Sequence, residues 1–420
     1  MTKVSIITQF YPPDYAATGQ LIEELANQLS QQKIKIQVIT GQPAYGQQKT
    51  LAPSREQQTN LNVRRSLTSR LWPQRLRGRV INGLLFCLIA GLRLLKPRYR
   101  GDVLLLTTEP PYLIFLGYLA KLIFRLPYVC LLYDLYPDVA VSLNVISENH
   151  WLTRLWNWLN EKIWRNAQGI IVLSSTMKER IVAKCPDIAD KISVIPNWSD
   201  PDYITPKPKT ENPFAIKHNL VQPFTVLYSG NMGRCHDMET IMATAWELKD
   251  EPIQFVFIGG GAKYNDCYHT VIKQWGLNNC LFLPFQPKED LPNSLTACDL
   301  SLVTISKGME GLVVPSKLYG FLAAGKPVAA VCEEHSYLSQ ILQEAGCGQT
   351  FVNGDSKGLA DYIRFLATYR EKVETMGQAG RRYLETHFTP EVVAQQYAQV
   401  LLGLSSSSNF SIQKQLEQLI

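Results

Sequence analysis

Short apolar runs alternate with helical patterns along this chain, and this alternation constrains the fold more than any other feature of the sequence. Residues 4–8 predict a buried strand, residues 9–19 a loop, and the next residues a helix with leucines at every fourth position. A further strand is predicted over residues 36–40. Strand–helix–strand order is typical of a parallel α/β sheet, in which ligands bind outside the carboxyl ends of the strands. The loop over residues 9–19 is therefore predicted to border a site.

The alternation occurs twice, which predicts two successive α/β domains. Residues 201–223 hold five prolines and little periodicity, as expected of a linker. We predict a first domain over 1–200, a second over 224–389, a helix over 390–404 that returns to the first domain, and a flexible tail over 405–420. Further strands are predicted over residues 103–107, 128–132, 169–173 and 194–198, then 225–228, 254–258, 300–304 and 328–331.

A helix is predicted between Ser316, its N-cap, and Gly325, and it carries two residues that do not suit a plain core helix. Pro315 and Ser316 mark its start, and Lys317 in the first turn is disfavoured by the helix dipole by roughly 0.3–1 kcal/mol. Gly320 in the interior costs about 1 kcal/mol relative to alanine. Both residues are accounted for if an anion lies at the helix start and a ligand packs against the first turns. The alternative is a surface lysine and a glycine at a helix crossing.

Glycines also follow two strands of the second domain. Gly230 and Gly233 lie in a strand-to-helix turn, where backbone N–H groups can approach a phosphate and Arg234 adds a guanidinium donor. Gly259 and Gly260 follow the next strand. Neither loop completes a dinucleotide fingerprint, so each is a weak signal when taken alone.

The excess positive charge of the chain is local. Residues 64–100 hold ten Lys or Arg and no Asp or Glu, whereas the rest of the chain holds 32 basic and 36 acidic residues. The apolar run over 81–95 in the same segment is too short to span a bilayer. A basic, apolar helix suits the surface of a membrane with anionic lipids, and the alternative is a buried helix with a solvated basic flank. Nucleic acid is disfavoured because no binding motif accompanies the charge.

No metal site is expected from the sequence. The nine cysteines are scattered without CxxC pairs, and the six histidines form no HxxxH pattern, so the cysteines are interpreted as reduced core residues of a cytosolic protein. The pair Asp200 and Asp202 resembles a metal-binding DxD motif, but it lies in a linker turn. An apolar strand starts within the first residues, so no signal peptide is expected.

Several short motifs, in this order and spacing, are similar to those of a known family. The chain resembles the retaining GT-B glycosyltransferases of the group-one or fourth family, of the kind that build exopolysaccharides such as colanic acid, and O-antigens. The resemblance covers nearly the whole chain. It implies two Rossmann-like, doubly wound parallel-sheet domains that face a cleft, with the linker over 201–223 as the hinge between them. Its motifs are Tyr11-Pro-Pro-Asp14 with Gly19, Tyr133-Asp-Leu-Tyr-Pro-Asp138, Val194-Ile-Pro-Asn-Trp198, Tyr228-Ser-Gly-Asn-Met-Gly233, Ile258-Gly-Gly260 and Pro315-Ser-Lys317.

The resemblance implies transfer of a sugar from a UDP- or GDP-sugar, bound by the second domain, to a saccharide acceptor bound by the first. No metal or other cofactor is implied. A lipid-linked acceptor would account for the segment over 64–100 and would place the protein in the cytoplasm, on the inner face of the membrane. The implied catalytic residues are Glu310 and Asp134. The implied donor-binding residues are Gly230, Asn231, Gly233, Arg234, Gly259, Gly260, Pro315, Ser316 and Lys317, and the acceptor-binding residues are Tyr15, Gly19, Tyr133 and Asp138.

The sequence departs from the family pattern at two positions. Family members often carry a second glutamate eight positions after the first, where this chain has Leu318, with Gly320 nearby. A histidine often stands at the position of Tyr133. Two other functions remain open from the sequence, namely a UDP-sugar epimerase on the same fold and a non-catalytic protein that binds a nucleotide sugar.

Overall fold

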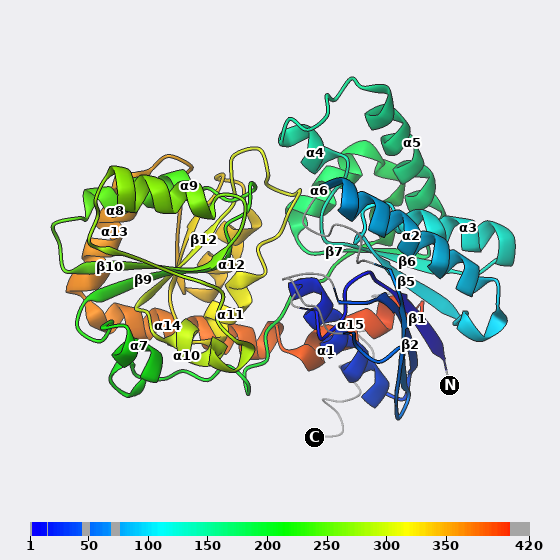
Figure 1. Ribbon diagram of the computed structural model, residues 1–420, viewed down its shortest axis with the longest axis horizontal. Helices are drawn as coiled ribbons and strands as arrows, with labels where there is room; N and C mark the ends of the chain where they lie inside the picture. The colour runs from blue at the N-terminus through cyan, green and yellow to red at the C-terminus, as the bar shows by residue number, and fades with distance from the viewer. Residues whose placement is uncertain (1, 15, 44–50, 69–75, 404–420) are drawn as a thin grey trace. The chain divides into compact units, whose positions relative to one another are not determined.

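The computed structural model describes residues 2–14, 16–43, 51–68 and 76–403, which form two compact units (Figure 1). Unit 1 comprises residues 1–137, 147–196 and 390–420, and unit 2 comprises 138–146 and 197–389. The chain therefore enters unit 2 a few residues before the predicted linker, whose residues are part of unit 2. The predicted tail over 405–420 lies outside the described residues.

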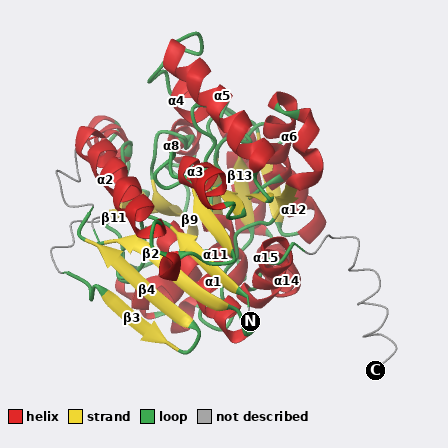
Figure 2. Cartoon of the chain, turned by 90° about the vertical axis from the view of Figure 1, so that its right-hand side faces the viewer, coloured by secondary structure: helices red, strands yellow, loops and turns green. Residues whose placement is uncertain are grey.

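Unit 1 is built on an eight-stranded sheet in the order β3-β4-β2-β1-β5-β6-β7-β8. Neighbouring strands are parallel except for the pair β3 and β4 at the edge, which Figure 2 shows beside β2. Strand order reverses between β1 and β5, so the predicted loop over 9–19 follows a strand at the switch point. The strands are β1 (Lys3–Ile7), β2 (Lys35–Gly41), β3 (Arg55–Gln58), β4 (Leu61–Ser66), β5 (Val103–Thr107), β6 (Tyr128–Leu132), β7 (Gly169–Val172) and β8 (Ile192–Val194).

Helices lie on both faces of this sheet (Figure 1). Helix α1 packs against α15, the helix from the end of the chain, and it buries Ile22, Leu25 and Leu29. On the other face, α3 contacts both α2 and α5. The helices of unit 1 are α1 (Ala17–Gln31), α2 (Leu76–Leu94), α3 (Ile114–Phe124), α5 (Trp151–Asn166), α6 (Ser175–Lys184) and α15 (Pro390–Leu401).

Unit 2 is built on a six-stranded parallel sheet in the order β11-β10-β9-β12-β13-β14. Numbered within the unit, this is the order 3-2-1-4-5-6 of a Rossmann fold. The strand order reverses between β9 and β12, so the loops after these two strands lie at the switch point. The strands are β9 (Phe224–Asn231), β10 (Ile253–Gly260), β11 (Cys280–Leu283), β12 (Leu300–Thr304), β13 (Val328–Val331) and β14 (Gly348–Phe351).

The sheet of unit 2 is also covered on both faces, with α8 and α13 together on one face and α11 and α14 together on the other (Figure 1). The core between the sheet and the first pair includes Phe255, Phe257 and Ile363. The helices are α4 (Asp138–Ser142), α7 (Pro213–Lys217), α8 (Met238–Glu247), α9 (Tyr264–Tyr268), α10 (Leu291–Thr296), α11 (Lys317–Ala323), α12 (Tyr337–Ala345), α13 (Ser356–Thr368) and α14 (Arg370–His387).

Some elements differ from the sequence predictions. The strand and turn predicted over 194–198 begins earlier, since β8 covers Ile192–Val194 and residues 195–198 are coil. Strands β3, β4, β11 and β14 were not predicted. The helix predicted to follow Ser316 as its N-cap has the expected ends, but it is buried almost all round instead of along one face. Within the described residues, no helix is both long and apolar enough to cross a bilayer.

A buried ion pair joins the predicted linker to the sheet of unit 2. Asp299 accepts from Lys209 Nζ at 2.7 Å and from the backbone N–H of Thr225, the second residue of β9, also at 2.7 Å. Burial lowers the pKa of Lys209, and the charge of Asp299 counters that shift. Residue 209 is therefore held to the domain that follows it.

We expect Asp299→Asn to lower the free energy of unfolding by about 2 kcal/mol, because the buried ammonium group then lacks its counter-charge. Denaturant unfolding measures the loss. Asp361→Asn is the matched control, since Asp361 pairs with Arg364 at 2.8 Å but its side chain is 75% exposed. That change should cost less than about 0.5 kcal/mol, and equal losses in the two variants would contradict the prediction.

Candidate active site

The donor-site residues predicted from sequence gather at the switch point of unit 2. Gly230 and Asn231 are the last residues of β9, and they lie in register with Gly259 and Gly260, the last residues of β10. Lys317 is the first residue of α11, which connects β12 to β13. The structure thus brings residues 87 positions apart to one edge of the sheet, where doubly wound folds bind ligands.

Glycine stands near the ends of strands β9 and β10 for two different physical reasons. A Cβ on Gly259 would lie 2.0 Å from the carbonyl oxygen of Gly230, so the packing of the two strand ends already requires a glycine there. Gly230 has φ +124°, and a Cβ on it would meet only Lys317, whose Cε lies 3.5 Å away. The side chain of Lys317 therefore lies directly over the end of β9.

Lys317 is an ammonium group held in place without an acidic partner. Its Nζ donates to the hydroxyl of Tyr228 at 2.5 Å, approaches the carbonyl oxygen of Asn231 at 3.4 Å, and lies 3.8 Å from the centroid of the Tyr228 ring. Burial lowers the pKa of Lys317 from its ordinary value to about 7, and no carboxylate of the described residues counters this shift. A bound anion would restore the charge, so the geometry favours a phosphate at this position.

His236 lies beside this lysine and was not predicted from the sequence. Its Nδ1 is 3.0 Å from the carbonyl oxygen of Thr304 at the end of β12, so Nδ1 carries the proton. Burial, with the charge of Lys317 as the second cause, lowers the pKa of His236 to about 3. The imidazole is therefore neutral, and its Nε2 is an acceptor for a hydroxyl group. The sequence signal that could have identified His236 was its position in a strand-to-helix turn, directly before the N-cap of α8.

The remaining predicted donor residues lie around this centre. Gly233 and the exposed Arg234 follow β9 in the turn before α8. Pro315 and Ser316 precede α11, and Ser316 occupies the N-cap position without a side-chain hydrogen bond to the helix. Glu310 is buried in the loop between β12 and α11, where its Oε1 lies 3.4 Å from the backbone N–H of Tyr337 at the start of α12.

Gly320 has a structural explanation that the sequence left as the alternative. A Cβ on it would lie 3.2 Å from Cδ1 of Leu295 in α10, so the glycine permits a close helix crossing. Leu318, at the position of the expected second glutamate, is fully buried in the core. The close ligand contact predicted from Gly320 is therefore not needed to account for that residue.

A second group of polar residues lies at the switch point of unit 1. Glu109 follows β5 and accepts a hydrogen bond from the hydroxyl of Thr18 in α1. Burial, with the charges of Asp134 and Asp14, raises the pKa of Glu109 to about 7 against the opposing effect of the hydrogen bond from Thr18. Burial also raises the pKa of Asp134, which follows β6, to about 6. The sequence analysis did not single out Glu109, because one carboxylate before a proline forms no recognisable motif.

The residues predicted to bind the acceptor lie in different elements of the structure. Tyr133 is buried at the end of β6, its backbone N–H donates to Thr108 Oγ1 at 3.0 Å, and its hydroxyl has no hydrogen-bond partner among the described residues. Gly19 lies in α1, where a Cβ would meet the backbone of Phe10 and Tyr11 at 3.1 Å, so packing already explains this glycine. Asp138 begins α4 and belongs to unit 2. Tyr15 lies outside the described residues.

In the described parts of the chain, no group of three or more His, Cys, Asp or Glu is arranged to hold a metal ion. The DxD-like pair forms a local turn, in which Asp200 Oδ1 accepts from the backbone N–H groups of Asp202 and Tyr203 at 2.8 and 3.2 Å. This agrees with its interpretation as a linker turn.

Comparison with known proteins assigns both halves of the chain to glycosyltransferase families. Residues 17–198 match the glycosyl transferase 4-like domain, and residues 210–383 match glycosyl transferases group 1. The chain is 26% identical over 412 residues to the probable glycosyltransferase WbjE of Pseudomonas aeruginosa, covering 97% of this chain and 100% of WbjE. It is 30% identical over 182 residues to the putative colanic acid biosynthesis glycosyl transferase WcaI of Escherichia coli (strain K12), covering 42% and 44%.

A solved structure has the same fold. HepE of Anabaena, in complex with UDP and glucose, is similar with a TM-score of 0.69 at 19% identity, over 96% of this chain and 99% of HepE. Both halves thus combine a family match with a doubly wound sheet, as the sequence predicted. The chain belongs to the GT-B glycosyltransferases, with a glycosyl transferase 4-like domain first and a group 1 domain second.

Proposed function

We propose that this glycosyltransferase moves a sugar from a nucleoside-diphosphate sugar to a lipid-linked saccharide, with retention of the anomeric configuration and without a metal. The donor assignment rests on Lys317. Its amino group is held over the end of β9, and burial lowers its pKa to about 7. HepE, with which the chain shares its fold, binds UDP and glucose, which supports a UDP-sugar before a GDP-sugar.

In this mechanism the leaving diphosphate gains charge as the bond to the anomeric carbon breaks. Lys317 and Arg234 would stabilise that charge in place of a metal ion, with the backbone N–H groups after β9. The neutral His236 would accept a hydrogen bond from a hydroxyl of the donor sugar. Glu310 would face the oxocarbenium-like sugar, whose positive charge a carboxylate stabilises. Retention rests on the resemblance of the donor motifs to retaining enzymes.

On the acceptor side, we propose that Glu109 and Asp134 hold the attacking hydroxyl and accept its proton. Their raised pKa values of about 7 and about 6 suit groups that exchange a proton near neutral pH. Tyr133 would complete this site with a buried hydroxyl.

The biological setting that we propose is exopolysaccharide or O-antigen synthesis in the cytoplasm, at the inner face of the membrane. WcaI, a relative that matches part of this chain, is described as a putative colanic acid biosynthesis glycosyl transferase. Segment 64–100 supports a membrane surface through α2, which exposes Leu84, Leu88 and Leu92. Part of its charge is structural, however, since Arg65 is buried and ion-paired with Glu56.

A thermal-shift screen tests the donor assignment. We expect one of UDP, GDP, ADP and CMP to raise the unfolding temperature, equally with and without magnesium, because Lys317 supplies the cation. At about 100 times the dissociation constant, the stabilisation should be about 2.7 kcal/mol. A shift that requires magnesium would contradict metal independence. Conversion of the nucleotide sugar without an acceptor would indicate an epimerase, and no turnover with any acceptor would favour a non-catalytic binding protein.

A further inference from the structure

Helix α2 of unit 1 is apolar on two opposite faces. Phe86, Ala90 and Leu94 face the sheet and are buried. Leu84, Leu88 and Leu92 repeat at four-residue intervals on another side of the helix, where they are 54%, 60% and 54% exposed. A helix that only covers a sheet needs one apolar face, with polar residues outside. The second face of α2 therefore calls for an apolar partner.

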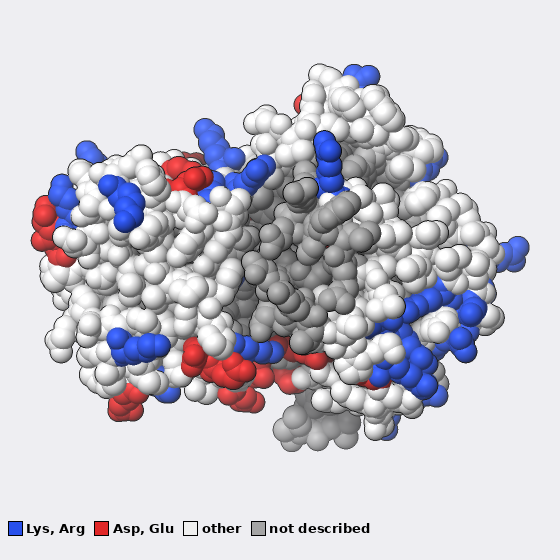
Figure 3. Space-filling view, in the orientation of Figure 1, with Lys and Arg blue, Asp and Glu red and all other residues white. Residues whose placement is uncertain are grey.

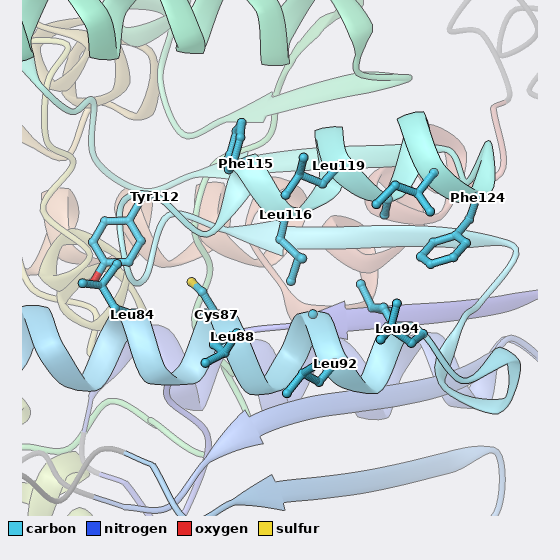
Figure 4. A pocket seen from close by; sticks show the side chains of 14 residues that line it. Leu84, Cys87, Leu88, Leu92, Leu94, Tyr112, Phe115, Leu116, Leu119 and Phe124 are labelled. Atoms are coloured by element: carbon cyan, nitrogen blue, oxygen red, sulfur yellow. The ribbon is translucent and has the colours of Figure 1, made fainter.

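The second face opens into a groove between α2 and α3. Figure 4 shows the groove lined from both helices, by Leu88 and Leu92 of α2 and by Phe115 and Leu119 of α3. The cavity volume is about 480 Å³, and the lining is almost wholly apolar. From Leu84 to Leu95 the groove follows α2 for on the order of 16 Å. This is an elongated hydrocarbon-lined slot within the size range of ligand sites.

The two helices that form the groove carry charge of one sign. Helices α2 and α3 contain no Asp or Glu, and Arg77 and Arg79 are exposed near the start of α2. Lys96 and Arg98 are exposed just beyond the end of α2. Lys and Arg side chains also gather over the part of unit 1 drawn at the lower right of Figure 3. An apolar slot along a helix with exposed basic residues at both ends is complementary to a hydrocarbon chain that ends in an anion.

We propose that the groove between α2 and α3 binds the hydrocarbon chain of the lipid phosphate that carries the saccharide acceptor. This inference rests on the proposed function and assigns the lipid part of its substrate to named residues. The groove is concave, whereas contact with a flat bilayer needs only a protruding apolar surface. Helix α5 offers such a surface separately, since Trp151 and Trp158 are 65% and 54% exposed and tryptophan is favoured at membrane interfaces.

Gly91 allows the groove to be filled without removing any apolar side chain. It lines the groove, and a Cβ on it would lie 3.3 Å from Cδ1 of Leu116, the end of a flexible side chain. Gly91→Leu should therefore occupy the slot, while Gly91→Ala at the same position should leave most of it open. A second pair separates groove from surface, because Leu88 lines the groove and Leu85, 36% exposed on the same helix, does not.

The probe is farnesyl phosphate below its micelle concentration, with binding measured by calorimetry on the full chain. We expect one saturable site in the wild type, weakened tenfold or more by Gly91→Leu and by Leu88→Gln. Tenfold corresponds to about 1.4 kcal/mol. Gly91→Ala and Leu85→Gln should stay within threefold of the wild type. Equal binding by wild type and Gly91→Leu would overturn the proposal.

Vesicles separate the carrier lipid from ordinary membrane lipid. Sedimentation with vesicles of phosphatidylcholine and phosphatidylglycerol should be the same for wild type and Gly91→Leu, because the substitution removes no apolar surface. A loss of vesicle binding that parallels the loss of farnesyl phosphate binding would assign the groove to bulk lipid and refute the carrier. The nucleotide-induced thermal shift distinguishes the two proposals. It should persist in Gly91→Leu, and its absence from the wild type would count against the proposed function alone.

Discussion

Replacing Lys317 with methionine is expected to stabilise the ligand-free protein and, at the same time, to weaken nucleotide binding by about a hundredfold. The ammonium group is buried at the switch point of unit 2, where it contacts the Tyr228 hydroxyl and ring and the Asn231 carbonyl and where no carboxylate of the described residues offsets its burial. Methionine fills similar space without a charge, and we expect a gain on the order of 2 kcal/mol at pH 7. The lost affinity reflects removal of a charged contact to the diphosphate.

The pH dependence of this effect has a definite sign. Because the pKa of Lys317 is lowered in the folded protein to about 7, the unfolded chain binds more protons between about pH 7 and its ordinary value of 10.5. The destabilisation is therefore fully present below pH 7 and is relieved as the pH rises through that window. The advantage of Lys317→Met in thermal or denaturant unfolding should accordingly shrink from pH 7 to pH 10.

Binding follows the opposite course, since a diphosphate favours the protonated lysine. We expect the affinity for the nucleotide sugar to fall by up to tenfold per pH unit above about pH 7, with proton uptake on binding, as calorimetry in buffers of different ionisation enthalpy measures. Lys317→Arg is the control, because arginine keeps its charge and should remove the pH dependence. Unchanged affinity in Lys317→Met would refute the phosphate assignment.

Replacing Glu109 with glutamine is expected to lower kcat by about a hundredfold while leaving the nucleotide-induced thermal shift of the protein unchanged. Glu109 lies at the switch point of unit 1 and is held by Thr18. Wild-type activity should fall as the pH drops below about 7, where the carboxylate takes up a proton. Glu109→Gln should lose this limb of the pH–rate profile, whereas a merely structural role would lower activity at every pH alike.

Two residues near Glu109 should shift the acid limb of the pH–rate profile in opposite directions. The charge of Asp134 raises the pKa of Glu109, so Asp134→Asn should shift the limb to lower pH. The hydrogen bond from Thr18 lowers it, so Thr18→Val should shift the limb to higher pH. Steady-state rates over pH 5–9 measure both changes. A limb that stays in place in both variants would mean that another group controls it.

The sequence alone was sufficient for the fold class and for placing the predicted donor-binding residues at one edge of a sheet. Alternating strands and helices permit little besides a parallel sheet, and residues after strands in such a sheet meet at one edge. Gly230, Gly259 and Lys317 were therefore predicted together and lie together. Two explanations of Gly320 stayed open, because a glycine in a helix indicates close approach without showing whether a ligand or Leu295 approaches.

Tertiary structure decided the properties that depend on burial and on neighbours distant in sequence. The lowered pKa values of Lys317 and His236 and the raised pKa of Glu109 arise mainly from desolvation, which no local pattern encodes. The groove of unit 1 needs α3 beside α2, so the apolar run over 81–95 could predict an apolar helix but not the slot that it borders. Sequence fixes which side chains follow each strand, and folding decides which of them lose water.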